Sequence, residues 1–96
     1  MTQEEAEWEI AEYLLKHKDG LKEKFKDYVQ EQIENGIGEI GISKRQFSAR
    51  VKRLATGLLQ QELMDRTTLG PEWIISIADE TYITNLLGEG YFDYYS

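Results

Sequence analysis

The chain has 96 residues, of which 41% are hydrophobic, and its 18 acidic residues exceed its 11 lysines and arginines to give a net charge of −7. This length supports a single domain over residues 1–96 and leaves no room for a large cofactor-binding fold. The absence of cysteine and the single histidine exclude disulfides and sites with cysteine or several histidine ligands. No apolar run approaches the roughly 20 residues of a membrane span, and the first residues are acidic where a signal peptide is basic. We therefore expect a cytoplasmic protein that is not an enzyme and holds no cofactor or metal.

Residues 1–35 predict two amphipathic helices. Thr2 and Glu5 have the spacing of a capping box, in which each side chain satisfies an amide at a helix start. The expected apolar sector of the first helix consists of Trp8, Ile10, Ala11, Leu14 and Leu15. Gly20 is expected to end this helix. The second helix carries apolar residues from Leu21 to Ile33, and we expect it to end at Asn35-Gly36.

Residues 36–42, GIGEIGI, contain three glycines and fit either a short strand or a tight helical turn. They include a G-x-G-x-x-G pattern, but a dinucleotide site needs that pattern at the turn from a buried strand into a helix. The preceding segment is polar and helical, so we interpret the pattern as a glycine-rich turn.

A third helix is predicted from a second capping box, formed by Ser43 and Gln46. Phe47, Val51, Leu54 and Leu58 recur with helical spacing and predict its core face. We expect this helix to end near Gly57. From Ile40 to Gln61 the chain has no acidic residue and five cations, whereas the rest of the chain has six cations and 18 acids.

Residues 59–77 predict a two-stranded β-ribbon. The segment LLQQELMDR is a plausible strand, Gly70-Pro71 indicates a turn, and WIISI is rich in β-branched residues. Asp79 is then expected to cap a last helix that ends at Gly88. Residues 88–96 form an aromatic tail.

The segment GISKRQFSARVKRLATGLL resembles the turn and recognition helix of winged helix-turn-helix regulators of the MarR type. Those helices commonly end in Arg-Leu, a short spacer and Gly-Leu-Leu, and WIISIADETYITNLL resembles a second wing strand followed by a helix. The resemblance covers about residues 41–87. It implies a mainly helical, winged-helix-like domain with a small β-ribbon and an extra N-terminal helix.

The same resemblance implies which residues meet double-stranded DNA. Those expected in the major groove are Ser43, Lys44, Arg45, Ser48, Ala49 and Lys52. Arg53 flanks this face in a helical projection, and Arg66, with Thr67 and Thr68, would reach from the wing.

The leading functional hypothesis is a small DNA-binding regulator of transcription, encoded by a virus or a mobile element. The alternative is a protein-binding module or phage-type inhibitor that acts on a host nucleic-acid enzyme through its acidic surface. Two interpretations also remain for the tail aromatics: a homodimer contact, or packing against the chain's own core. These residues are Tyr91, Phe92, Tyr94 and Tyr95.

Overall fold

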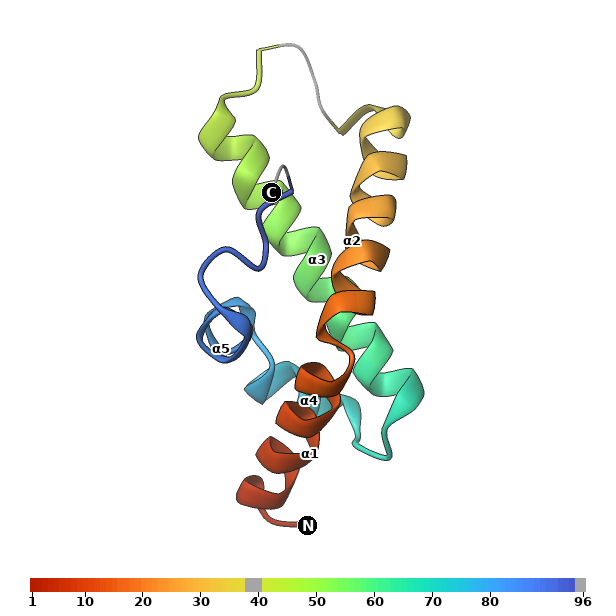
Figure 1. Ribbon diagram of the computed structural model, residues 1–96, viewed down its shortest axis with the longest axis vertical. Coiled ribbons are helices and arrows are strands. Elements are labelled where there is room, and N and C mark those ends of the chain that lie inside the picture. Colours follow the sequence, from red (N-terminus) through yellow and green to blue (C-terminus); the bar gives the residue numbers. More distant parts are fainter. Residues whose placement is uncertain (38–40, 95–96) are drawn as a thin grey trace.

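The computed structural model describes residues 1–37 and 41–94, which form an elongated helical domain of 46 × 22 × 21 Å (Figure 1). Its elements are α1 (Gln3–Lys16), α2 (Lys18–Gln32), the wide turn η1 (Ile33–Ile37), α3 (Lys44–Arg66), α4 (Pro71–Ile77) and α5 (Glu80–Leu87). The start of α1 lies at one end of the long axis, and the end of α2 and the start of α3 lie at the other. None of the helices in these residues is long and apolar enough to cross a membrane.

The predicted capping box at the start of α1 is confirmed. The Thr2 hydroxyl accepts from the Glu5 amide at 3.2 Å, and the Glu5 carboxylate accepts from the Thr2 amide at 3.1 Å. The predicted end of this helix at Gly20 is wrong. The single residue His17 both ends α1 and precedes α2, so Gly20 lies inside the first turn of α2.

The third predicted helix begins where the sequence indicated but continues much further. Ser43 and Gln46 form the expected capping box, and α3 then runs without interruption to Arg66. The predicted end near Gly57 is wrong because the core contacts continue beyond that glycine. Residues spaced by four are buried along α3, namely Val51, Ala55, Leu59 and Leu63. Their burial offsets the cost of about 1 kcal/mol that a mid-helix glycine imposes.

The predicted β-ribbon, and with it the winged-helix-like fold class, is wrong. No strand occurs in residues 1–37 or 41–94, and WIISI belongs to α4. Gly70 is the N-cap of that helix and Pro71 its first residue, a position that suits proline because no amide donor is needed there. Ile74 and Ile77 are buried with helical spacing. The β-branched residues are thus accommodated by tertiary burial, which outweighs their strand preference.

The two halves of α3 are covered by different parts of the chain. Its C-terminal half is linked to α1 and α2 through Glu62, and α4 and α5 also pack with α3. The C-terminal segment contacts its N-terminal half, where Tyr94 meets Phe47 (Figure 1). Two residues predicted for the core of the first helix lie outside it. Trp8 is 72% exposed and Leu15 is 53% exposed, whereas Ala6, Ile10 and Leu14 are fully buried.

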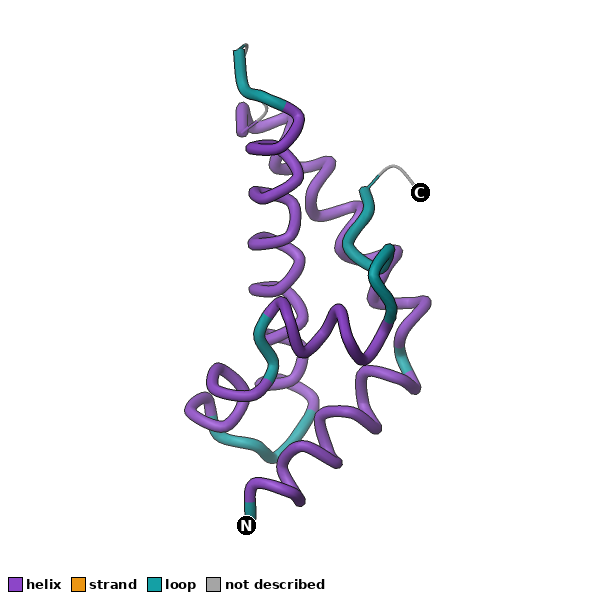
Figure 2. Tube along the Cα trace, turned by 90° about the vertical axis from the view of Figure 1, so that its left-hand side faces the viewer, coloured by secondary structure: helices purple, strands orange, loops and turns teal. Residues whose placement is uncertain are grey.

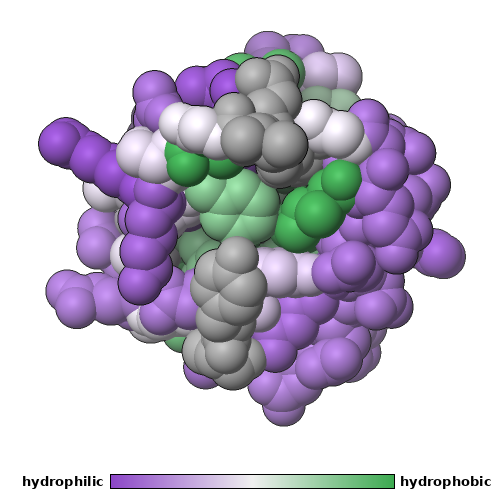
Figure 3. Space-filling view, turned by 90° about the horizontal axis from the view of Figure 1, so that it is seen from above, coloured by the Kyte–Doolittle hydropathy of each residue, from purple (hydrophilic) through white to green (hydrophobic). Residues whose placement is uncertain are grey.

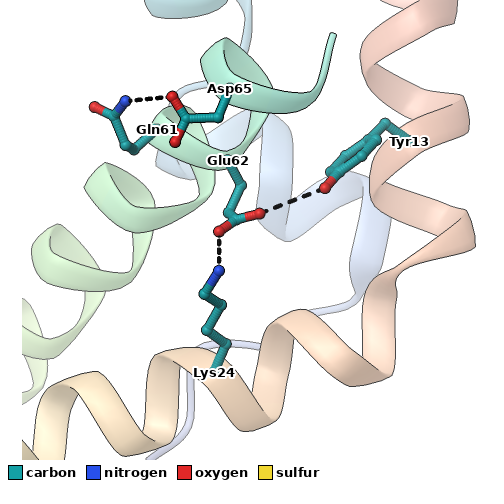
Figure 4. Close-up of polar contacts among 5 residues, drawn as sticks. All are labelled: Tyr13, Lys24, Gln61, Glu62 and Asp65. Atoms are coloured by element: carbon teal, nitrogen blue, oxygen red, sulfur yellow. Dashed lines mark hydrogen bonds and ion pairs between the residues drawn. The ribbon is translucent and has the colours of Figure 1, made fainter.

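A partly buried polar cluster joins α1, α2 and α3 (Figure 4). Glu62 of α3 is 9% exposed, and its carboxylate contacts the ammonium of Lys24. The hydroxyl of Tyr13 donates to the other carboxylate oxygen at 3.5 Å. Burial, and next the negative charge of Glu62, raise the pKa of Tyr13. These contacts hold the bend between α1 and α2 against α3.

Candidate nucleic-acid interface

A shallow groove of about 640 Å³ follows the outer side of α3 and is continued by the start of α5. Five of the residues predicted to meet DNA line this groove together: Arg45, Ser48, Ala49, Lys52 and Arg53. The remaining lining residues are Thr56, Gly57, Gln60 and Glu80. The small side chains of Ser48 and Ala49 leave space between the cations, so a ligand can approach the helix backbone.

The groove is open because the buried stripe of α3 winds around the helix. Successive core residues are four apart, and each step of four rotates by about 40° from the last. A direction that faces solvent near Arg45 is therefore covered by the core at Leu63. This side of α3 changes from exposed to covered near Gln60, whose side-chain amide donates to the carbonyl of Ala78 at 2.9 Å. Figure 2 shows α3 running along the long axis of the molecule, with the C-terminal segment to its right.

The charges along the groove are predominantly positive. Arg45 and Arg53 are exposed, Lys52 is half-buried, and Glu80 at the start of α5 is the acidic lining residue. The glutamates of α1 lie toward the other end of the molecule (Figure 1). Since exposed charges are screened beyond about 8–10 Å at physiological salt, those acids oppose an anion in the groove only weakly.

The other predicted contact residues lie away from this groove. Ser43 is occupied as the N-cap of α3. Lys44 lines a separate depression, together with Phe47, Phe92 and Tyr94. Arg66 lies at the far end of α3, beside the cluster around Glu62. The structure thus groups five of the eight predicted residues and separates Ser43, Lys44 and Arg66 from them.

The two threonines expected beside Arg66 in the wing hold the chain together instead. The hydroxyl of Thr67 donates to the carbonyl of Leu63 at 2.5 Å. The hydroxyl of Thr68 donates to the carboxylate of Glu9 at 3.3 Å, which links the α3–α4 connection to α1.

The tail aromatics pack against the chain's own helices. Tyr91 and Phe92 are 4% and 2% exposed, and both rings lie against Phe25 of α2. Tyr94 is half-buried, contacts the ring of Phe47 edge-on, and donates to the side-chain oxygen of Gln30. Tyr95 lies outside the described residues. Figure 3 looks down the long axis from the end where α2 ends and α3 begins. In this view apolar residues occupy the middle and hydrophilic residues surround them.

One exposed surface was not anticipated as an apolar site. Trp8 stands on the outer face of α1, with Glu4 one turn before it and Glu12 one turn after it. Met1 is 63% exposed, and Met1, Glu4, Glu5, Trp8, Glu9 and Glu12 line a hollow of about 580 Å³. The signal in the sequence is the interval of seven residues between Trp8 and Leu15, which places both on one side of the helix.

The class that the structure defines is a small all-helical domain with a basic groove along one helix and an acidic, tryptophan-bearing face on another. Within the described part of the chain, no group of three or more histidine, aspartate or glutamate side chains is arranged to hold a metal ion. No protein-family model, no curated protein and no solved structure matches the chain.

Proposed function

We propose that this protein binds double-stranded DNA through the outer face of the N-terminal half of α3. The observation that carries the proposal is the clustering of Arg45, Lys52 and Arg53 along one groove with a floor of small residues. The major groove of B-DNA is about 12 Å wide and admits an α-helix. The proposal needs no wing, because the contact residues belong to one helix.

The geometry supports a modest electrostatic contribution. The groove offers three cations, so at most three phosphates are neutralised, and log K should fall with log salt with a slope of about −2.7. Sequence preference then depends on base contacts, and Arg45 is the candidate because arginine can donate two hydrogen bonds to guanine. A regulator of transcription would use that preference to select its site.

The test is a titration of labelled duplex DNA by fluorescence anisotropy at several salt concentrations, on a site selected from a random pool and on random duplex. Arg45→Ala should weaken binding to the selected site by about 1–3 kcal/mol and relax the preference at one base position. Lys52→Ala should weaken binding to both duplexes and reduce the salt slope by about one.

Arg66→Ala is the matched control, because it removes the same charge from the other end of α3. It should leave DNA binding unchanged. A wild-type protein that shows no salt-dependent DNA binding and selects no sequence would overturn the proposal.

A further inference from the structure

The outer face of α1 combines an apolar anchor with negative charge. Trp8, at 72% exposed, is flanked by the exposed carboxylates of Glu4 and Glu12. Tryptophan is favoured at protein interfaces because its ring buries a large area with little loss of conformational entropy. A partner for this face must therefore offer a recess for the ring and positive charge around it.

The groove on α3 of the same chain has that chemistry. Its volume of about 640 Å³ and its small-residue floor at Ser48 and Ala49 leave room for an indole ring. The guanidinium groups of Arg45 and Arg53 can pair with the glutamates, and either can stack on the ring in a cation–π contact. The outer face of α1 and the groove on α3 of the same chain thus complement each other in charge and in shape.

The two surfaces cannot meet within one molecule, because Trp8 and the first turns of α3 lie toward opposite ends of the 46 Å axis (Figure 1). We propose that α1 of one copy docks into the α3 groove of a second copy, head to tail. The contact occupies the groove proposed for DNA, so DNA and a second copy compete for it. The inference rests on the proposed function only in that competition; the association itself needs no nucleic acid.

Two charge-reversed variants test the contact. Glu4→Lys/Glu12→Lys changes only the α1 face and keeps Glu5, which is required for the capping box. Arg45→Glu/Arg53→Glu changes only the α3 groove. Glu23→Lys/Glu31→Lys is the matched control, because it reverses two exposed charges on α2.

Sedimentation without nucleic acid, at about 0.05 M and about 0.5 M salt, gives the readout, since salt screens the charge pairs. The wild-type mass should rise above 11.2 kDa with concentration at low salt. Each of the two variants alone should stay monomeric, and the α2 control should associate as the wild type does. Each variant keeps one intact face, and the two reversed faces also complement each other in charge. An equimolar mixture of the two should therefore associate although neither variant does so alone.

A second measurement follows Trp8 directly. Trp73→Phe leaves Trp8 as the single tryptophan of the chain, so its emission should shift to the blue as concentration rises at low salt. Adding duplex DNA should reverse the shift if both ligands compete for the groove.

Three results would overturn the inference. One is a wild-type protein that stays monomeric at every concentration, which would leave the α1 face to a different protein. Another is failure of the mixed variants to associate. The third is association unchanged by both pairs of substitutions. If the mixed variants associate but the wild-type protein does not bind DNA, the proposed function alone is rejected.

Discussion

The carboxylate of Glu62 on α3 contacts the ammonium of Lys24 on α2, and the two residues are 38 positions apart in the sequence. Glu62 is buried while the Lys24 side chain is about half exposed. Removing the lysine leaves a buried carboxylate that, among the contacts drawn in Figure 4, keeps the hydrogen bond from the Tyr13 hydroxyl. This pair therefore links the bend between α1 and α2 to the C-terminal part of α3.

Lys24→Met should lower the free energy of unfolding by about 1–3 kcal/mol, because an unpaired buried charge is costly. Lys24→Met/Glu62→Met should recover part of that loss, since it removes both charges. Urea denaturation of the wild type, both single variants and the double variant gives the coupling free energy. Lys16→Met, an exposed lysine on α1, is the control and should change stability by less than about 0.5 kcal/mol. Additive effects of the two substitutions would contradict the contact.

Leu14 and Leu15 offer a direct test of the orientation of α1. Leu14 is fully buried and Leu15 is 53% exposed. Leu14→Ala should cost about 2–5 kcal/mol because it leaves a cavity in the core. Leu15→Ala should change the free energy of unfolding by no more than about 0.5 kcal/mol. Equal losses in thermal or urea unfolding would show that the helix is rotated from the orientation described.

Gly57 distinguishes a continuous α3 from a helix that ends at a glycine turn. It lies on the outer side of α3, and an added Cβ would meet nothing within 4 Å. Gly57→Ala should therefore stabilise the protein by about 0.5–1 kcal/mol. Gly36→Ala is the control: its φ of +98° strains an alanine, so this substitution should destabilise. Urea midpoints measure the change in stability of both variants. A loss of stability in Gly57→Ala would mean that the helix is interrupted at that residue.

Tyr91 should make stability fall in alkaline solution. Burial, and next the charge of Asp19, raise the pKa of Tyr91 to about 12, against about 10 for an exposed tyrosine. Below pH 10 the hydroxyl is protonated in both states. Between about pH 10 and 12 it ionises first in the unfolded chain, so the free energy of unfolding decreases over that interval.

Tyr91→Phe removes this titration and should make the alkaline decrease smaller. It also removes the hydrogen bond to the carbonyl of Lys18, at 2.9 Å, and should cost about 1 kcal/mol at neutral pH. Urea midpoints measured from pH 8 to pH 12 provide the comparison, with Tyr28→Phe as a matched loss of one hydroxyl. An unchanged alkaline slope in Tyr91→Phe would refute the assignment.

Removing the negative charge of Glu80 should increase the affinity for DNA. Its carboxylate lines the basic groove and opposes phosphate there. Glu80→Gln should tighten binding to random duplex severalfold at low salt, with a smaller gain at high salt because the effect is electrostatic. Glu72→Gln, on α4 and not among the groove residues, should leave the affinity unchanged. Equal affinities of wild type and Glu80→Gln in the anisotropy titration would place the phosphate backbone elsewhere.

What could be predicted from the sequence was mostly local. The two capping boxes, the Asp79 cap and the Gly88 end depend on residues within one or two turns, and all are confirmed. The grouping of Arg45, Ser48, Ala49, Lys52 and Arg53 also followed from helical spacing on one helix.

The errors arose where a distant segment decides the outcome. WIISI favours a strand by composition, but Ile74 and Ile77 find a core with helical spacing. Gly57 indicates a helix end by itself, yet burial of Leu59 and Leu63 beyond it continues α3. Trp8 and Leu15 fit the apolar sector of α1 by spacing, and only the position of α4 and α5 decides which side of that helix is covered.

The C-terminal segment has a consequence for the order in which the protein folds. Its contacts close very long loops: the Tyr91 hydroxyl reaches Lys18 across 73 residues, and the Lys22 ammonium reaches the Gly90 carbonyl across 68. Helices form within about a microsecond, whereas contacts of high sequence separation slow folding because the loop entropy is lost first. In the folded protein the ring of Phe25 is fully buried and contacts the rings of Tyr91 and Phe92. We therefore expect a late folding step in which a nearly formed helical framework still exposes this aromatic surface.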